Sequence, residues 1–155
     1  MPESLKTKMW RLGCNMLFPA YVGTGGWVQY VADDLKEIRV KLPLSFRTRN
    51  YVGTIFGGSL YASIDPFYMI MLMTNLGKDY VVWDKAANIR FKKPGRETLF
   101  ANFLITDEEL SEIKKILETQ DKVDRIYNVE LVNKEGVVHA AIEKTVYIAK
   151  KRSDI

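Results

Sequence analysis

The stretch TIFGGSLYASIDPFYMIMLMTNLG, residues 54–77, decides the fold. It is apolar almost all round, and a helix of that composition is stable only when other elements cover every side of it. Gly57 and Gly58 mark its entrance, and Gly77 is a usual residue just beyond a helix end. We therefore expect a buried central helix over about residues 57–76.

The rest of the composition bounds the class of protein. A chain of 155 residues suits a single domain, 1–155, with its own hydrophobic core. The formal net charge of +4 is mild, and its basic residues form no long block, so charge alone does not indicate nucleic-acid binding. The apolar stretch contains Asp65 and Pro66 and is shorter than the roughly 20 residues of a bilayer span, so we expect no membrane segment.

Cysteine and histidine are too scarce for several kinds of site. Cys14 is the only cysteine and His139 the only histidine, which excludes an intramolecular disulfide and a Cys/His metal cluster. Lys6, Lys8 and Arg11 interrupt the stretch before Cys14, so it does not read as an export signal. We expect a cytoplasmic protein without a metal, in which Cys14 is an inert, buried thiol.

The segments around the central helix alternate as antiparallel strands do. The expected order is an N-terminal helix, a hairpin, the central helix, and four strands interrupted by one short helix. The expected helices are 5–18, ended by Pro19, and 106–118, opened by a capping box; the expected strands are 27–32, 37–42, 80–92, 98–105, 125–132 and 137–149, with a frayed tail at 150–155.

For two of the strands, the alternation of residue types predicts which side chains share a face of the sheet. Over residues 80–92, strict alternation predicts one face formed by Trp83, Ala87, Ile89 and Phe91, and the opposite face formed by Asp84, Asn88, Arg90 and Lys92. Over residues 137–149, the apolar face is formed by Val138, Ala140, Ile142, Val146 and Ile148. His139 falls on the other face of that strand and is expected to be an ordinary strand residue.

This order of elements resembles the hotdog fold, an α+β domain in which a curved antiparallel sheet wraps a long helix. The motif Asn50-x-x-Gly53-Thr54-x-x-Gly57-Gly58, followed by Asp65, is similar to that of phenylacetate-type acyl-CoA thioesterases of this fold. Those enzymes have His-Gly-Gly at the helix entrance, and here Phe56 stands where that family has its histidine. The blocks RNYVGTIFGGSLYASIDPFY and VVWDKAANIRFKKPGR resemble more closely a bacterial branch described as thioesterase-like or uncharacterised.

The resemblance implies a catalytic set of Asp65, Asn50, Gly57 and Gly58. Backbone N–H groups in the first turn of a helix have no intrahelical partner, so those of Gly57 and Gly58 can bind a thioester oxygen. Asp65 then acts as the base or the water-orienting carboxylate, with Asn50 positioning the water. The resemblance also implies paired sheets in a homodimer, possibly a homotetramer, with Asp65 facing Gly58 of the other subunit.

Each of these residues also has a purely structural interpretation. Asp65 before Pro66 is a suitable N-cap for a helix that restarts there. Gly57 and Gly58 also suit a sharp turn into a helix or close packing against a partner. Lys85 is predicted to lie on the Trp83 face, where it can pair with a carboxylate of the cleft or extend into solvent at the strand end.

The predicted substrate-binding residues lie within or just after the glycine motif, or on the strand expected over residues 80–92. They are Thr54, Phe56, Tyr61, Tyr68, Trp83, Lys85, Arg90 and Lys92. Basic side chains that can meet the phosphates of coenzyme A, or lie in solvent, are Arg47, Arg49, Arg90, Lys92, Lys93 and Arg96. Residues that can line an acyl tunnel or simply pack in the core are Tyr61, Phe67, Tyr68, Met69, Met71 and Met73.

The leading functional hypothesis is an acyl-CoA thioesterase, a hydrolase that needs no cofactor because coenzyme A is part of the substrate. The alternative is a protein that binds an acyl-CoA or a lipid without hydrolysing it, with Phe56 reflecting lost catalysis. A dehydratase ranks last, because that chemistry uses a histidine paired with an acid and His139 is poorly placed.

Overall fold

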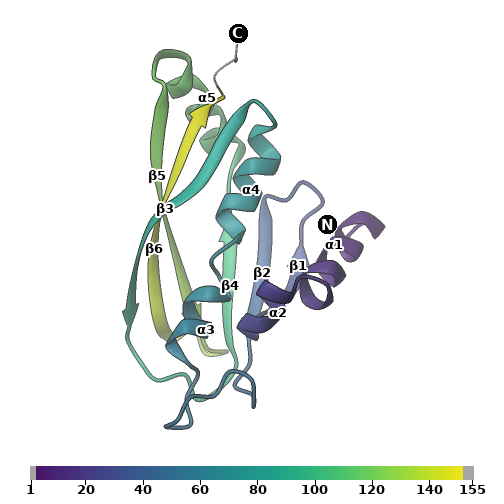
Figure 1. Ribbon diagram of the computed structural model, residues 1–155, viewed down its shortest axis with the longest axis vertical. Coiled ribbons are helices and arrows are strands. Elements are labelled where there is room, and N and C mark those ends of the chain that lie inside the picture. Colours follow the sequence, from purple (N-terminus) through teal and green to yellow (C-terminus); the bar gives the residue numbers. More distant parts are fainter. Residues whose placement is uncertain (1–2, 152–155) are drawn as a thin grey trace.

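A six-stranded antiparallel sheet forms the frame of the computed structural model, which describes residues 3–151. Its strands lie in the order β1-β2-β4-β5-β6-β3 (Figure 1). Their bounds are β1 Trp27–Val31, β2 Glu37–Leu42, β3 Tyr80–Phe91, β4 Leu99–Leu104, β5 Lys122–Val132 and β6 Val138–Lys150. The helices are α1 Leu5–Met16, α2 Pro19–Thr24, α3 Gly57–Ala62, α4 Phe67–Leu76 and α5 Asp107–Thr119.

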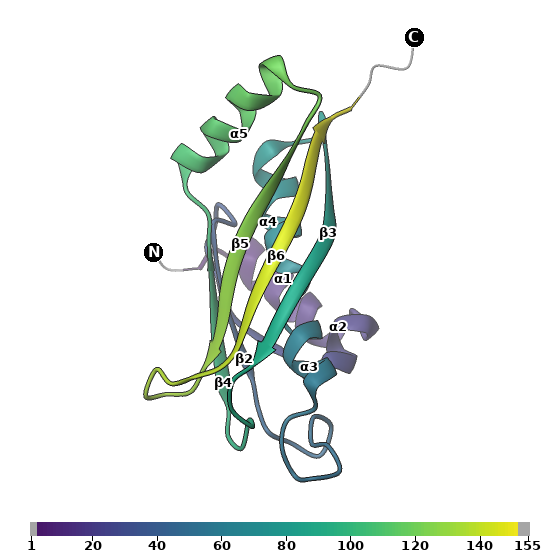
Figure 2. The ribbon, with the colours of Figure 1, turned by 90° about the vertical axis from the view of Figure 1, so that its left-hand side faces the viewer.

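The arrangement confirms the expected hotdog fold. The sheet curves, and in Figure 2 α1 and α4 lie behind its long strands, α2 and α3 lie beside the lower end of β3, and α5 lies at one end. The two predicted hairpins are present, and α5 begins with the predicted cap, in which the Thr106 side chain accepts a hydrogen bond from Glu109 N. The helix α2 was not predicted, because its Pro-Ala-Tyr-Val-Gly-Thr sequence reads as a turn.

The central helix covers the predicted region but is broken into α3 and α4 at residues 63–66. Proline lacks the N–H that a continuing helix would use, so Pro66 interrupts the ladder of hydrogen bonds. The α4 cap is Pro66 without a side-chain hydrogen bond, so Asp65 does not serve as the N-cap that its place before proline suggests. The break leaves the Asp65 carboxylate available for another partner.

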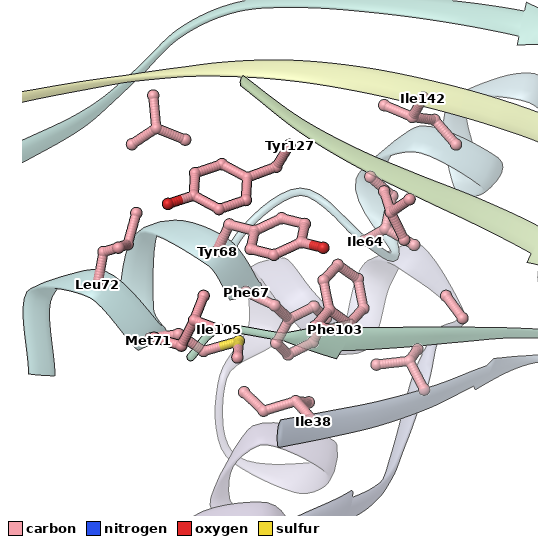
Figure 3. Packing of buried hydrophobic residues seen from close by; sticks show 14 of the residues in the cluster. Ile38, Ile64, Phe67, Tyr68, Met71, Leu72, Phe103, Ile105, Tyr127 and Ile142 are labelled. Carbon is pink, nitrogen blue, oxygen red and sulfur yellow. The ribbon is translucent and has the colours of Figure 1, made fainter. Parts of the chain in front are cut away.

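Aromatic side chains from α4 form the centre of the core (Figure 3). The rings of Phe67 and Phe103 are 5.0 Å apart, and those of Tyr68 and Tyr127 stack at 4.3 Å. Tyr68 is only 5% exposed, and its hydroxyl donates to Asn128 O at 3.5 Å. Tyr68, predicted as a substrate-binding residue, is therefore a core residue. Met71, a candidate for the acyl tunnel, is also fully buried there.

A β-bulge changes the predicted faces of β3. The register with β6 shifts between Asp84 and Ala86, so Lys85 is the extra residue. Cross-strand partners lie on the same face of a sheet, and Asp84 is opposite the buried Val146, on the side of the central helix. The predicted grouping is therefore wrong for Asp84, which shares a face with Ala87, Ile89 and Phe91.

Trp83 changes sides for the same reason. It is paired with Tyr147 on the outer face and is 63% exposed. A bulge inserts one residue into a strand, so strict alternation fails beyond it. Nothing in the residue types of β3 distinguishes Lys85 as the inserted residue.

The N-terminal helix α1 is held to the edge of the sheet by a buried amide. Asn15 Nδ2 donates to Val28 O at 2.9 Å, and Asn15 Oδ1 accepts from Val28 N at 2.7 Å. The side chain thus replaces a neighbouring strand for one residue of β1. The apolar series Leu5, Met9, Leu12 and Met16 lies on the opposite side of α1 and is 56 to 75% exposed.

The last described residues continue the strand β6. The strand β6 extends to Lys150, one residue beyond the predicted end, and Lys151 N donates to Asp79 O at 2.8 Å. The rest of the predicted tail lies outside the described residues. Within residues 3–151, none of the helices has the length and apolar character needed to cross a membrane.

Replacing the amide that docks α1 should destabilise the domain. Asn15→Ala leaves the N–H and C=O groups of Val28 without partners, so we expect the free energy of unfolding to fall by roughly 2 kcal/mol. The exposed neighbour provides the control, because Met16→Ala should change it by no more than about 0.5 kcal/mol. Urea unfolding checks both variants, and equal effects would contradict the assigned role of Asn15.

Candidate active site

The most unusual side chain of the molecule is a buried lysine. Lys144 lies on β6 between Ile142 and Val146, in the register that faces the core, and its side chain is 0% exposed. Its Nζ lies 3.0 Å from Asp65 Oδ1 and 3.0 Å from Asp84 Oδ1. It also donates to the backbone oxygen of Asp65. A buried ammonium costs several kcal/mol unless it is paired, so these contacts offset the cost of burying Lys144.

The two carboxylates reach Lys144 through the two irregularities of the fold. Asp65 lies in the break between α3 and α4, and Asp84 lies beside the bulge of β3. Their side chains are 42% and 23% exposed. Two carboxylates around one ammonium give the cluster a formal charge of −1.

Asp84 is the less well paired of the two. Its Oδ1 forms the ion pair with Lys144, but the alignment falls outside that of a hydrogen bond, and Oδ1 has no hydrogen-bond partner among the described residues. Burial raises the pKa of Asp84 above its usual value, and the charge of Lys144 opposes this rise. Asp84 is thus a buried carboxylate whose ionised form depends on Lys144.

Tyr61 adds a hydroxyl to the cluster. It lies four residues before Asp65, and its ring centre is 5.8 Å from Lys144 Nζ. Burial, followed by the neighbouring carboxylates of Asp65 and Asp84, raises the pKa of Tyr61 above its usual value. The hydroxyl is therefore neutral at ordinary pH and can donate a hydrogen bond.

Asp65 and Tyr61 border an apolar cavity of about 560 Å³ between α1–α2 on one side and α3–α4 on the other. Cavities of this size are typical of small-molecule sites. The lining residues are Trp10, Cys14, Phe18, Ala20, Tyr21, Thr24, Tyr61, Ala62, Asp65, Pro66, Phe67 and Ile70. The cavity thus has apolar walls and one carboxylate, that of Asp65, which connects it to the charged cluster.

Two of the other predicted catalytic residues, Asn50 and Gly57, line a different cavity. Asn50, Thr54 and Gly57 border a second hollow of about 350 Å³, together with Phe91 and Lys92. Asn50 Nδ2 donates to Thr54 Oγ1 at 2.8 Å, and Asn50 Oδ1 accepts from Thr54 N at 2.9 Å. Within one chain, Asn50 closes its own turn, and the structure does not bring it together with Asp65.

Aromatic rings cover the glycines at the start of α3. A Cβ atom at Gly58 would collide with the ring of Phe56, and one at Gly57 would lie 3.3 Å from Phe91 Cζ. Phe56 itself is 58% exposed. The residue at the histidine position of the resembled family thus rests against the second glycine.

The remaining predicted binding residues are dispersed. Lys85 pairs with Asp124 at the surface, which agrees with the solvent-exposed alternative for this residue. The lysine that pairs with a carboxylate of the cavity is Lys144. Arg90 and Lys92 border a groove over β5 and β6 with Glu130. Lys92 also borders the hollow beside Asn50.

Sequence reasoning missed Lys144, although a signal was present. Lys144 is the one charged position in the alternating apolar series of β6, exactly two residues from Ile142 and from Val146. A lysine in a core-facing register requires a buried acid, which could have been sought. In residues 3–151, no group of three Cys, His, Asp or Glu side chains is placed to hold a metal ion.

Removing the buried ammonium should destabilise the protein in a pH-dependent way. Lys144→Met leaves Asp65 and Asp84 without their cation, and we expect a loss of about 3 kcal/mol at pH 7, reduced by the partial exposure of Asp65. A carboxyl whose pKa is raised on folding is stabilising in its protonated form and destabilising as pH rises through that pKa. The loss should therefore be smaller at pH 5 than at pH 7.

Thermal unfolding across this pH range measures the effect. Lys85→Met is the matched control, because its exposed ion pair with Asp124 is worth little and its removal should be nearly independent of pH. If the stability lost in Lys144→Met is as large at pH 5 as at pH 7, the assigned pairing of Lys144 with two ionised carboxylates is wrong.

Comparisons with known proteins agree with this fold. Residues 7–148 match the family model described as "Domain of unknown function (DUF4442)". No curated protein sequence matches the chain.

Solved structures share the fold at low sequence identity. A Pseudomonas aeruginosa protein of unknown function, described as a probable thioesterase, superimposes with a TM-score of 0.83 at 14% identity, covering 97% of this chain and 99% of that one. A Chlorobaculum tepidum protein of unknown function gives 0.73 at 16% identity, covering 94% and 95%. A Haemophilus influenzae thioesterase gives 0.67 at 14% identity, covering 99% and 96%. With the family model matching most of its length, this chain belongs to the DUF4442 family and has the hotdog fold of thioesterase-like proteins.

Proposed function

We propose that this protein hydrolyses an acyl thioester, with coenzyme A as the thiol of the substrate. The observation that carries the proposal is the Asp65 carboxylate, which a buried lysine holds in place at the edge of an apolar cavity. The structural neighbours described as thioesterases support the same class of substrate.

Asp65 is the general base in this proposal. Lys144 binds Asp65 Oδ1, which fixes the carboxylate and leaves its second oxygen to accept a proton from water. The water oxygen bonds to the thioester carbon, the tetrahedral intermediate collapses, and the carbon–sulfur bond breaks. The proton held by Asp65 passes to the departing sulfur, so the products are a carboxylic acid and a thiol.

The proposed site is completed by a second copy of the chain. The strand β3 is 12 residues long and forms one edge of the sheet, and an unpaired edge of that length is suited to pairing with another strand. Pairing of β3 with its copy would give a homodimer, from which a homotetramer can be built. In that dimer, the Gly57–Gly58 amides of the partner polarise the thioester carbonyl, and Asn50 acts beside them.

The basic residues fit the phosphates of coenzyme A. Lys92 and Lys93 border the hollow that also contains Asn50 and Gly57, and Arg90 lies two residues before Lys92, near the end of β3. Lysine and arginine are common phosphate ligands. The pantetheine arm then runs from these residues of one subunit to Asp65 of the other.

The second candidate is an acyl-CoA or lipid carrier without hydrolysis. The observation that favours it is Phe56, whose ring rests against Gly58 where the resembled enzymes have a histidine. In this case the same cavity holds the ligand, but the carbonyl is not polarised and the thioester stays intact.

Removing the base tests the leading proposal. Thiol release is measured on butyryl-, octanoyl-, palmitoyl- and phenylacetyl-CoA, and Asp65→Asn should lower kcat by at least about 100-fold because general base catalysis is lost. Asp124→Asn, at the exposed Lys85 pair, is the matched control and should retain full activity. Absence of turnover by the natural protein on every thioester would favour the carrier.

Sharing of the site between subunits has its own test. Asp65→Asn and Gly58→Val, each inactive alone, are unfolded together and refolded as a mixture. Half of the dimers then contain one intact site, so about a quarter of the natural activity should return. Failure to recover activity, with mixed dimers confirmed by mass spectrometry, would place the whole site within one chain.

A further inference from the structure

The apolar cavity beside Asp65 is walled by parts of the chain that the motif does not include. One wall is formed by Trp10 and Cys14 of α1 and by Phe18, which follows it. The opposite wall is formed by Ala62 at the end of α3 and Ile70 of α4. Of the residues that the sequence suggested for an acyl tunnel or for the core, Tyr61 and Phe67 border this cavity, whereas Tyr68 and Met71 are packed in the core.

We propose that this cavity binds the chain of a neutral acyl ligand, with the carbonyl group beside Asp65 and Tyr61 and the hydrocarbon between α1–α2 and α4. The inference rests on the proposed function. It adds where the acyl chain lies and that the end of the ligand beside Asp65 is uncharged. The helices α1 and α2 thereby become determinants of chain length.

The walls account for the preference for hydrocarbon. Apart from Asp65 and Thr24, the side chains around the cavity are apolar or aromatic, including the thiol and ring groups of α1. Each methylene moved from water into such surroundings tightens binding by roughly fourfold. Affinity should therefore rise along a series of straight-chain alcohols until the cavity is filled.

The cluster at the end of the cavity accounts for the preference for a neutral ligand. The charged groups there are Asp65, Asp84 and Lys144, with a formal sum of −1, and the Tyr61 hydroxyl is neutral. The Tyr61 hydroxyl is paired with the Asp65 side chain, so an alcohol can donate its own hydrogen bond to the carboxylate. A carboxylate in the same place would face Asp65, so the cavity disfavours the acid that hydrolysis produces and promotes its release.

Cys14 provides a built-in reporter for occupancy. It is the only cysteine of the chain, it borders the cavity, and it is half-buried. Burial raises its pKa to about 11, so a maleimide reacts with it slowly. A ligand lying against the thiol slows that reaction further by excluding the reagent.

The experiment measures the rate of Cys14 labelling by N-ethylmaleimide, by intact mass, with hexanol, octanol, decanol or decanoate. We expect saturating decanol to slow labelling at least fivefold, with octanol and hexanol requiring successively higher concentrations. Decanoate at pH 8 should protect at least tenfold less well than decanol at equal concentration. In Asp65→Asn this difference should narrow, because the opposing carboxylate is gone.

Variants that fill the cavity test its location. Ala20 borders the cavity and is exposed, so Ala20→Trp should fold normally and reduce decanol protection severalfold; Ala62→Phe is a second variant of the same kind. Leu17→Trp is the matched control, since Leu17 is 77% exposed and is not part of the lining. Each variant is compared as the ratio of labelling rates with and without decanol, and titration calorimetry measures decanol binding directly.

The outcomes separate this inference from the proposed function. Protection of Cys14 by decanol without turnover of any thioester would retain the cavity assignment and overturn the hydrolase. Hydrolysis that depends on Asp65, without decanol binding or with equal protection in Ala20→Trp and Leu17→Trp, would retain the hydrolase and overturn the cavity assignment. Equal protection by decanoate and decanol would overturn the preference for a neutral end group.

Discussion

The ammonium group of Lys144 is the constraint on which the site depends. It is fully buried, and it contacts Asp65 and Asp84, which come from two other elements. Neither acid would be in reach if the central helix and β3 were regular. The cost of burying a charge therefore ties together the break in the helix, the bulge in β3 and the register of β6.

The helix break determines what Asp65 can do. In a continuous helix, this residue would occupy one more position of a side that is buried against the sheet. Asp65 lies just before Pro66, the N-cap of α4, so its backbone oxygen is not used by that helix and is available to Lys144, and its carboxylate stands between the lysine and the apolar cavity. One carboxylate oxygen is thus anchored while the residue stays partly exposed, which is the arrangement required of a base acting on a bound ligand.

The two halves of the predicted catalytic set lie in separate hollows of one chain. The turn at Asn50 and the start of α3 border one hollow, and Asp65 borders the other. Such a separation agrees with the proposed dimer, because a C2 axis beside β3 would present the hollow of each subunit to the carboxylate of the other. The helix α1 lies on β1, at the edge of the sheet opposite to β3, where Asn15 holds it in place.

The sequence by itself determined the hotdog architecture, both hairpins, the cap of α5 and the candidate residues Asp65, Asn50, Gly57 and Gly58. The hairpins and the cap depend on apolar periodicity and turn residues, which act over a few residues. The architecture and the candidate residues follow instead from a resemblance in element order and motif. Only the tertiary structure decided the partners of those residues. It placed Tyr68 in the core, turned Trp83 outward and set Lys144 beside Asp65 and Asp84, because the alternation within one strand does not show where a bulge lies or which side chains of distant elements will meet.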